Sequence, residues 1–298
     1  MQDTSLGDIA SRANWVLSIL PPSEAYAFAQ RFRDAHSKEV GTRRLAFADC
    51  NAVNPETAKL IASVFVDTPI KFIDAGIIGG PPQGQYDPVF YASADVGDED
   101  VLDEFAGLQV HGLKVKLLKG EGASVGDASA LKMSYAGITK GIIGICTTMI
   151  LCTSTTFSCC VNTYLIWEYA RILAAHAASP ATSQALLHEL ASSQPVILQR
   201  IAASTNGMLP KAYRWVGEME EISAFVEGGL NPSTTKPTDT SRALKGTEDG
   251  PELIHMGLAK LYDRIALAVE DDKDGKEAED VKVLQGFVEE AKKVISSK

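Results

Sequence analysis

The sequence predicts an α/β domain with a mostly parallel sheet, followed by an all-helical domain. Before residue 120, short apolar runs alternate with amphipathic segments, which is typical of strands connected by helices. Beyond residue 128, almost every segment has helical periodicity. Between the two lies a glycine-rich turn at residues 120–126, and a helical run follows it with Lys132 one turn inside. We therefore place the α/β domain at residues 1–119, the helical domain at 120–269, and a charged linker with a terminal helix at 270–298.

Composition narrows the class of protein and its partners. The chain has 298 residues, of which 45% are hydrophobic, and this length accommodates two domains. Its formal net charge of −10 argues against nucleic acid or an anionic membrane surface as the main partner. A local basic pocket for an anionic substrate remains compatible with this charge.

The N-terminal residues and the cysteines indicate the cellular compartment. We see no secretory signal, and four of the five cysteines crowd between Cys146 and Cys160. This is not a disulfide framework, so we expect a reducing, cytoplasmic setting. No histidine lies near these cysteines at zinc spacing, and we expect no metal site.

The elements of the α/β domain follow from local patterns. Strands are predicted at residues 15–20, 44–49, 71–74, 88–94 and 113–118. Helices are predicted at residues 23–33 with Ser23 as N-cap, at 55–64 with Asn54 as N-cap, and at 98–105. Residues 76–82, which contain three glycines and two prolines, are predicted to form a turn-rich loop. Strands alternating with helices indicate a doubly wound sheet.

The helical domain is predicted from longer periodic segments. Helices are expected at residues 131–178, 182–201, 211–227 and 251–269, with a minor amphipathic helix at 281–294. Residues 228–250 are rich in Thr, Pro and Ser and are predicted to form an exposed loop.

Residues 141–167 contain no charged side chain, so their length alone would allow a membrane span. Thr, Ser, Asn and Cys interrupt the segment, which favours a buried central helix over a membrane span. A further hypothesis is that residues 152–171 are an unspliced insertion, because their removal joins residues 149–151 to Ile172 and Leu173 in a helix of ordinary composition.

Five segments in order resemble one enzyme family. They are Val16-Leu-Ser-Ile-Leu-Pro-Pro22, Asp49-Cys-Asn-Ala-Val-Asn-Pro-Glu-Thr-Ala-Lys59, Asp74-Ala-Gly-Ile-Ile-Gly-Gly80, residues 126–140, and Lys211-Ala-Tyr-Arg-Trp-Val-Gly-Glu-Met-Glu-Glu-Ile222. Together they resemble the β-hydroxyacid dehydrogenases, the family of 6-phosphogluconate and 3-hydroxyisobutyrate dehydrogenases. The last segment resembles the signature of the branch with a 6-phosphogluconate-dehydrogenase-like C-terminal domain. The resemblance covers about residues 8–268, apart from the uncharged insertion.

The resemblance implies a hydride transfer between a small hydroxy acid and NAD or NADP. Lys132 would be the general acid/base that moves the hydroxyl proton, because hydride leaves a carbinol carbon easily only if the O–H proton leaves too. The residues implied to line the cofactor are Leu20, Pro21, Pro22, Asn51 and Ala52. Those implied for the substrate are Ile78, Gly79 and Gly80, whose loop would hold a carboxylate through backbone N–H groups, and Lys140. The resemblance also implies a homodimer formed through the helical domain.

The sequence departs from the family pattern in three places. Ile78 stands where the family usually has a serine, and Ala136 where it commonly has an asparagine. No Gly-x-Gly-x-x-Gly turn precedes Trp15. The turn at 120–126 is one candidate substitute, but its third glycine comes one residue late. The preferred interpretation is an incomplete Rossmann domain that lacks its first βαβ unit. An alternative function is therefore a catalytically inactive family member kept as a dimerising or binding protein.

Overall fold

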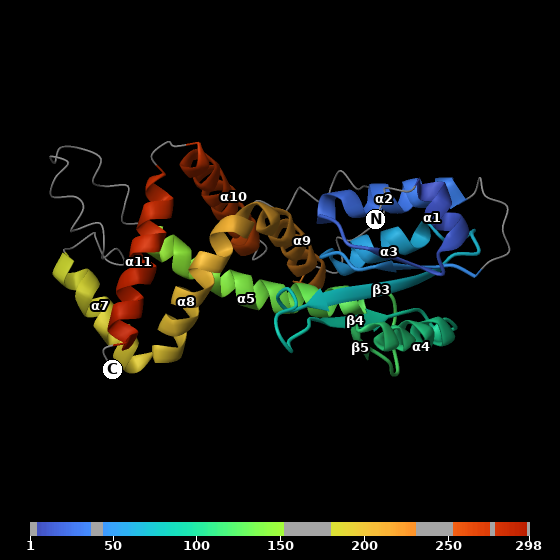
Figure 1. The fold of residues 1–298 in the computed structure, drawn as a ribbon, viewed down its shortest axis with the longest axis horizontal. Helices are drawn as coiled ribbons and strands as arrows, with labels where there is room; N and C mark the ends of the chain where they lie inside the picture. The colour runs from blue at the N-terminus through green and yellow to red at the C-terminus, as the bar shows by residue number, and fades with distance from the viewer. Residues whose placement is uncertain (1–4, 37–43, 152–179, 231–252, 275–277, 297–298) are drawn as a thin grey trace. The chain divides into compact units, whose positions relative to one another are not determined.

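The structure, a computed structural model, describes residues 5–36, 44–151, 180–230, 253–274 and 278–296 (Figure 1). Contacts divide the chain into two compact units. The sheet unit comprises Met1–Gly137 and Gly217–Ile254, and the helical unit comprises Ile138–Val216 and His255–Lys298. The division passes through three of the described helices, α5 (Asp127–Leu151), α9 (Ala212–Leu230) and, near its first residue, α10 (Leu253–Lys273). The first part of α5 therefore belongs to the sheet unit, although the sequence placed the whole helix in the second domain.

The described residues of the sheet unit form a five-stranded, mostly parallel sheet, which confirms the predicted fold class. The strands are β1 (Trp15–Ser18), β2 (Ala46–Asp49), β3 (Lys71–Ile78), β4 (Val89–Ser93) and β5 (Lys114–Leu117). They lie in the order β1-β2-β3-β4-β5, and every pair is parallel except the antiparallel pair β3–β4. A short loop joins β3 to β4, which is possible because an antiparallel pair needs no helical crossover.

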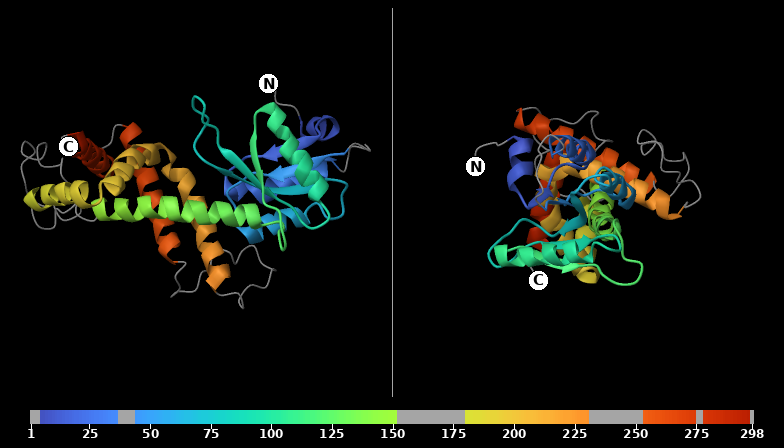
Figure 2. Two further views of the ribbon diagram at one scale, coloured as in Figure 1. Left: turned by 90° about the horizontal axis from the view of Figure 1, so that it is seen from below. Right: turned by 90° about the vertical axis from the view of Figure 1, so that its right-hand side faces the viewer.

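Two apolar clusters hold helices against the two faces of this sheet (Figures 1 and 2). One face packs against α1 (Leu6–Arg12), α2 (Pro22–His36) and α3 (Pro55–Ser63), and the other against α4 (Glu99–Gly107), which continues into η1 (Leu108–His111). Phe47 lies at the centre of the first cluster, with ring centroids 5.6 Å from Phe32 and 4.8 Å from Phe65. On the second face, Phe105 of α4 is fully buried against the sheet. The strands are apolar on both sides because helices cover both faces.

Several predicted boundaries hold and others need correction. Asn54 is the N-cap of α3, accepting bonds from the N–H groups of Glu56 and Thr57. The prediction of Ser23 as an N-cap is wrong, because α2 already begins at Pro22, whose fixed φ suits the first helical turn. The predicted loop at 76–82 is also partly wrong. β3 continues to Ile78, because residues 76–78 pair with β4.

The helical unit contains α7 (Pro180–Ser193), α8 (Pro195–Met208), η3 (Leu209–Lys211), α10 (Leu253–Lys273) and α11 (Glu279–Ser296). The single helix predicted at 182–201 is wrong: the chain breaks at Gln194, because Pro195 has no N–H and starts a new helix. α11 packs on α8 and α7 and buries Leu284 and Phe287, so it is part of the core of this unit.

Some predictions lie outside the described residues. These are the proposed insertion at 152–171 and almost all of the loop at 228–250, and the uncharged segment 141–167 is described only up to residue 151. Within the described ranges, no helix has both the length and the apolar composition needed to cross a membrane.

Candidate functional site

A row of four polar residues crosses the sheet unit. Ser18, Asp49, Asp74 and Ser93 are register partners on β1, β2, β3 and β4, so their side chains share one face of the sheet. Each is no more than 2% exposed. We call this set the polar row. Ser18 and Asp49 are the last residues of their strands, and ligands of parallel α/β sheets bind outside the carboxyl ends of the strands.

Asp74 anchors the N-terminus of α5 on this row. Its Oδ2 accepts the N–H of Gly126 at 2.9 Å and that of Ser129 at 3.0 Å, and its Oδ1 accepts the Ser129 hydroxyl at 2.7 Å. The Ser93 hydroxyl accepts the N–H of Ala128 at 3.1 Å. A carboxylate here satisfies amides that the first turn of a helix leaves unpaired. Burial raises the pKa of Asp74, while these bonds oppose the rise.

The turn at 120–126 is therefore not a phosphate loop, and that alternative is wrong. The N–H of Val125 is bonded to Asp95, the N–H of Ser124 to Asp127, and the N–H of Gly126 to Asp74. A phosphate loop needs backbone amides that point at the ligand. Here the protein's own carboxylates occupy them.

Lys132 lies where α5 crosses β3. A Cβ at Gly76 would come within 2.8 Å of the Ala128 carbonyl oxygen and 3.1 Å of the Lys132 Cβ, so only glycine allows this close approach. The half-buried Lys132 side chain then reaches along β3, and its Nζ donates to the carbonyl oxygen of Ile77 at 2.6 Å. The structure thus brings Lys132 to the same short stretch that carries the predicted substrate residues Ile78, Gly79 and Gly80.

Those three residues differ in what they expose. Ile78 ends β3 with a half-buried aliphatic side chain, whereas Gly79 and Gly80 form an exposed turn. The N–H of Gly80 donates to the Tyr86 hydroxyl at 3.2 Å. Tyr86 is absent from the predicted site, and its sequence position in a polar loop gave no signal of this contact.

The predicted cofactor residues divide into exposed and buried ones. Leu20 and Pro21 are exposed, and Pro22 and Ala52 are partly exposed. Asn51 is buried with its polar groups engaged: its Oδ1 accepts the Leu20 N–H at 2.5 Å, and its Nδ2 donates to Ser18 and to Asp49. Asn51 therefore fixes the loop after β1 and does not present its amide to a ligand.

Asp49 is the least satisfied member of the polar row. Its Oδ1 accepts from Asn51, but its buried Oδ2 has no hydrogen-bond partner among the described residues. Burial, and then the neighbouring charge of Asp74, raise the pKa of Asp49 to about 7. Because water does not solvate the buried carboxylate, the neutral form of Asp49 is favoured over the charged form.

Glu221 joins α9 to the start of α3 within the sheet unit. Its Oε2 accepts the Asn54 backbone N–H at 2.8 Å, the Asn54 side-chain amide at 2.7 Å and the Thr57 hydroxyl at 3.3 Å. Burial raises the pKa of Glu221. It lies in the segment 211–222 that carries the family resemblance, but no local pattern predicts a partner so distant in sequence.

Lys140, also predicted to bind substrate, belongs to the helical unit. Its ammonium is 5.1 Å from the ring centre of Trp215, and its carbonyl oxygen accepts the Tyr262 hydroxyl at 2.6 Å. These contacts give Lys140 a packing role within its unit.

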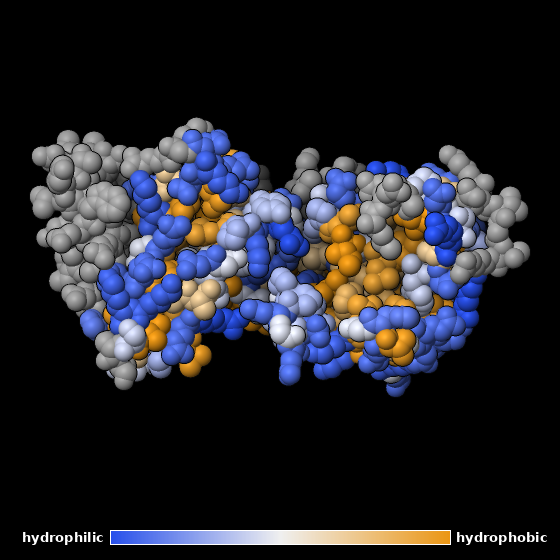
Figure 3. Space-filling model, in the orientation of Figure 1, coloured by the Kyte–Doolittle hydropathy of each residue, from blue (hydrophilic) through white to orange (hydrophobic). Residues whose placement is uncertain are grey.

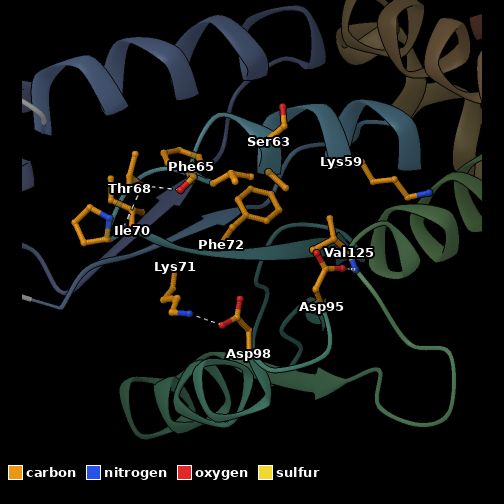
Figure 4. Close-up of a pocket in the computed structure, with 13 residues that line it drawn as sticks. Lys59, Ser63, Phe65, Thr68, Ile70, Lys71, Phe72, Asp95, Asp98 and Val125 are labelled. Carbon is orange, nitrogen blue, oxygen red and sulfur yellow. Dashed lines mark hydrogen bonds and ion pairs between the residues drawn. The ribbon is translucent and has the colours of Figure 1, made fainter. Parts of the chain in front are cut away.

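The sheet unit also has a cavity of about 360 Å³ between the end of α3, the start of β3 and the loop after β4 (Figure 4). Phe65, Phe72 and Val125 line its apolar side, and the ion pair between Lys71 and Asp98, at 2.6 Å, lies across it. None of the sequence-predicted site residues lines this cavity.

Comparison with solved structures shows which proteins share the fold of this chain. A conserved hypothetical protein from Sinorhizobium meliloti 1021 shares this fold, with a TM-score of 0.54 at 17% identity over 95% of this chain and 78% of that one. The conserved protein MTH1747 of unknown function, whose structure is described as similar to 3-hydroxyacid dehydrogenases, matches with a TM-score of 0.48 at 22% identity over 96% and 81%. An imine reductase from Myxococcus stipitatus in complex with NADP+ matches with a TM-score of 0.40 at 14% identity over 96% and 83%.

The helical part is identified more specifically. Residues 177–265 match the family described as a domain of unknown function, DUF1932. This match includes the segment 211–222, the last of the five segments on which the family resemblance rests. The search of curated proteins gave no match.

Proposed function

We propose that the chain is an NAD(P)-dependent oxidoreductase that transfers hydride from a small hydroxy acid, with Lys132 as the general acid/base. The observation that carries this proposal is the position of the Lys132 amine, 2.6 Å from the Ile77 carbonyl oxygen and beside the exposed turn of Gly79 and Gly80. Asp74 fixes the start of α5 on β3 and so determines which residues of β3 lie next to Lys132.

Lys132 would move the proton of the substrate hydroxyl. The bond to the Ile77 carbonyl oxygen fixes the position of Nζ. A lysine ammonium has three N–H donors, so it can donate to more than one acceptor at a time. In the alcohol-oxidising direction Nζ takes the hydroxyl proton as the carbonyl forms, and in the reverse direction it returns that proton.

The described residues fit the nicotinamide end of the implied cofactor, which when bound would accept or supply the hydride. Leu20 and Pro21 are exposed beside the carboxyl ends of β1 and β2, and the side chain of Asn51 accepts the Leu20 N–H and so ties this loop to β2. A flat ring can lie on such a surface. The 120–126 turn offers no cradle for the diphosphate, because the amides of Ser124, Val125 and Gly126 are engaged by side-chain carboxylates.

That engagement favours the second candidate, a family member that no longer turns over substrate and serves as a dimerising or binding protein. The two functions differ in cofactor binding, which a titration of the full chain with NADPH and with NADH measures directly. Saturable binding in the micromolar range supports the oxidoreductase. Absence of binding at millimolar cofactor contradicts it and leaves the second candidate.

The Lys132→Ala variant tests the chemistry. We expect cofactor affinity to stay within a few-fold of the parent, and kcat with a panel of short hydroxy acids to fall by about 10²–10⁴, the usual contribution of a general acid/base. Lys119→Ala is the matched control, because Lys119 lies outside the site and pairs with Asp103 at 2.5 Å. If Lys132→Ala and Lys119→Ala turn over equally fast, the proposed role of Lys132 is wrong.

A further inference from the structure

The Tyr86 side chain closes over the turn that follows β3. Its hydroxyl accepts the Gly80 N–H at 3.2 Å, although the tyrosine is 49% exposed and lies on the loop that leads to β4. The ring is therefore held at the backbone and also borders solvent. An exposed tyrosine in a loop has no need of such a contact for burial.

Two features of the loop build this contact. Gly79 has φ +132°, and a Cβ there would lie 2.1 Å from the Tyr86 hydroxyl oxygen, so glycine at 79 is what lets the phenol reach the backbone. Tyr86 itself is held by two backbone bonds with Gln83: its N–H donates to Gln83 O at 3.0 Å, and its carbonyl accepts the Gln83 N–H at 2.9 Å. The loop thus presents the hydroxyl in a defined place.

The hydroxyl retains a donor. A phenol has one O–H to give and lone pairs to accept, and here an acceptor position is used by Gly80. Among the described residues, no bond donated by the Tyr86 O–H is found. A carboxylate near Gly79 and Gly80 would accept that O–H, and bonds to an ionised acceptor are the stronger kind. Ile78, the preceding residue, brings no side-chain donor of its own.

We propose that the Tyr86 hydroxyl binds the substrate carboxylate at the Gly79–Gly80 turn, which makes it a specificity-determining residue. The inference rests on the proposed function and names the residue that recognises the carboxylate of the substrate. Only Ile78 and Gly79 lie between Ile77, whose carbonyl oxygen accepts from Lys132, and Gly80, whose amide donates to Tyr86. The two polar side chains therefore contact the same short stretch of backbone.

The Tyr86→Phe variant tests this by separating KM from kcat. Removing the hydroxyl keeps the ring and should raise KM for the short hydroxy acid about tenfold or more, with kcat and the affinity for NADPH nearly unchanged. With the methyl ester of the same acid as substrate, the parent and the variant should have similar KM values. Tyr213→Phe is the matched control, because Tyr213 is 65% exposed and lies in the helical unit. Equal acid-to-ester preference in Tyr86→Phe and the parent overturns the proposal.

A second measurement does not depend on turnover. Butyrate, a short carboxylate without the reacting hydroxyl, is titrated into the ¹⁵N-labelled full chain while the Gly80 amide resonance is followed. A saturable shift in the parent that Tyr86→Phe weakens supports the carboxylate site, even if Lys132→Ala shows that the proposed chemistry is wrong. A Gly80 resonance that butyrate does not move, or moves equally in Tyr86→Phe, overturns the site.

Discussion

Asp49 shows how one buried carboxyl group ties stability to pH. Its pKa of about 7 in the folded chain, against 3.8 when solvated, means that the folded state binds the proton more tightly. Between these values the folded state carries more protons than the unfolded state, so the free energy of unfolding falls as pH rises from about 4 to 7 and levels off above. The difference of about 3 pKa units corresponds to at most about 4 kcal/mol.

We therefore expect Asp49→Asn, which imitates the neutral carboxyl, to unfold at a higher free energy than the parent at pH 8 and at a similar one at pH 5. Urea unfolding at both pH values measures this. Asp74 and Glu221, whose charges act on Asp49, are present in both proteins. Asp67→Asn, at an exposed position, is the control. Parallel pH curves for the parent and Asp49→Asn would contradict the assignment.

At the scale of an element, α5 depends on a cap that comes from another part of the chain. Asp74 on β3 receives the amides of Gly126 and Ser129, so the helix start is determined by a strand rather than by a residue next to it in sequence. Asp74→Asn replaces one of the two accepting carboxylate oxygens by an NH₂ group, which cannot accept from these donors. We expect it to lower the free energy of unfolding by about 2–3 kcal/mol and to weaken exchange protection of the Gly126 and Ser129 amides.

Ser129→Ala gives a smaller expected effect for comparison. It removes only the hydroxyl bond to Asp74 and should lower the free energy of unfolding by about 1 kcal/mol. Chemical unfolding and amide hydrogen exchange measure both variants. Equal stability of Asp74→Asn and the parent would mean that the cap does not hold α5.

At the scale of the whole molecule, we propose the homodimer that the resemblance implies. Hydrophobic residues are visible on the face of the molecule drawn in Figure 3. In the described part of the helical unit, Ile138, Ile142 and Ile145 are 65%, 41% and 53% exposed. They follow each other on α5 at intervals of four and three residues, which places them on one helix face. A second copy of the chain would bury this face.

Light scattering of the purified chain should give twice the monomer mass of 31.9 kDa. Ile142→Asp should shift the mass to that of the monomer, because a charge on a buried apolar face is costly. Val96→Asp is the control, since Val96 is 86% exposed on a loop of the sheet unit. A monomeric parent, or a dimer that Ile142→Asp leaves intact, contradicts this proposal.

Much of the fold could be predicted because its signals are local. Apolar runs ended by glycine or proline gave the strands, Asn54 followed by Pro55 gave the start of α3, and the change of periodicity after residue 120 gave the helical part. The break between α7 and α8 also has a local signal, Pro195, which the prediction of one continuous helix overlooked.

The sequence by itself determined which segments become strands and helices, and that Lys132 lies on a helix behind a glycine-rich turn, because these depend on residues close together in the chain. Only the tertiary structure decided that β3 extends to Ile78, that Asp74 caps α5, that Glu221 bonds Asn54, and that Tyr86 holds Gly80. Each of these rests on a hydrogen bond or a register between residues that meet only when the chain folds. Periodicity along one segment contains no information about the partner that another segment brings to it.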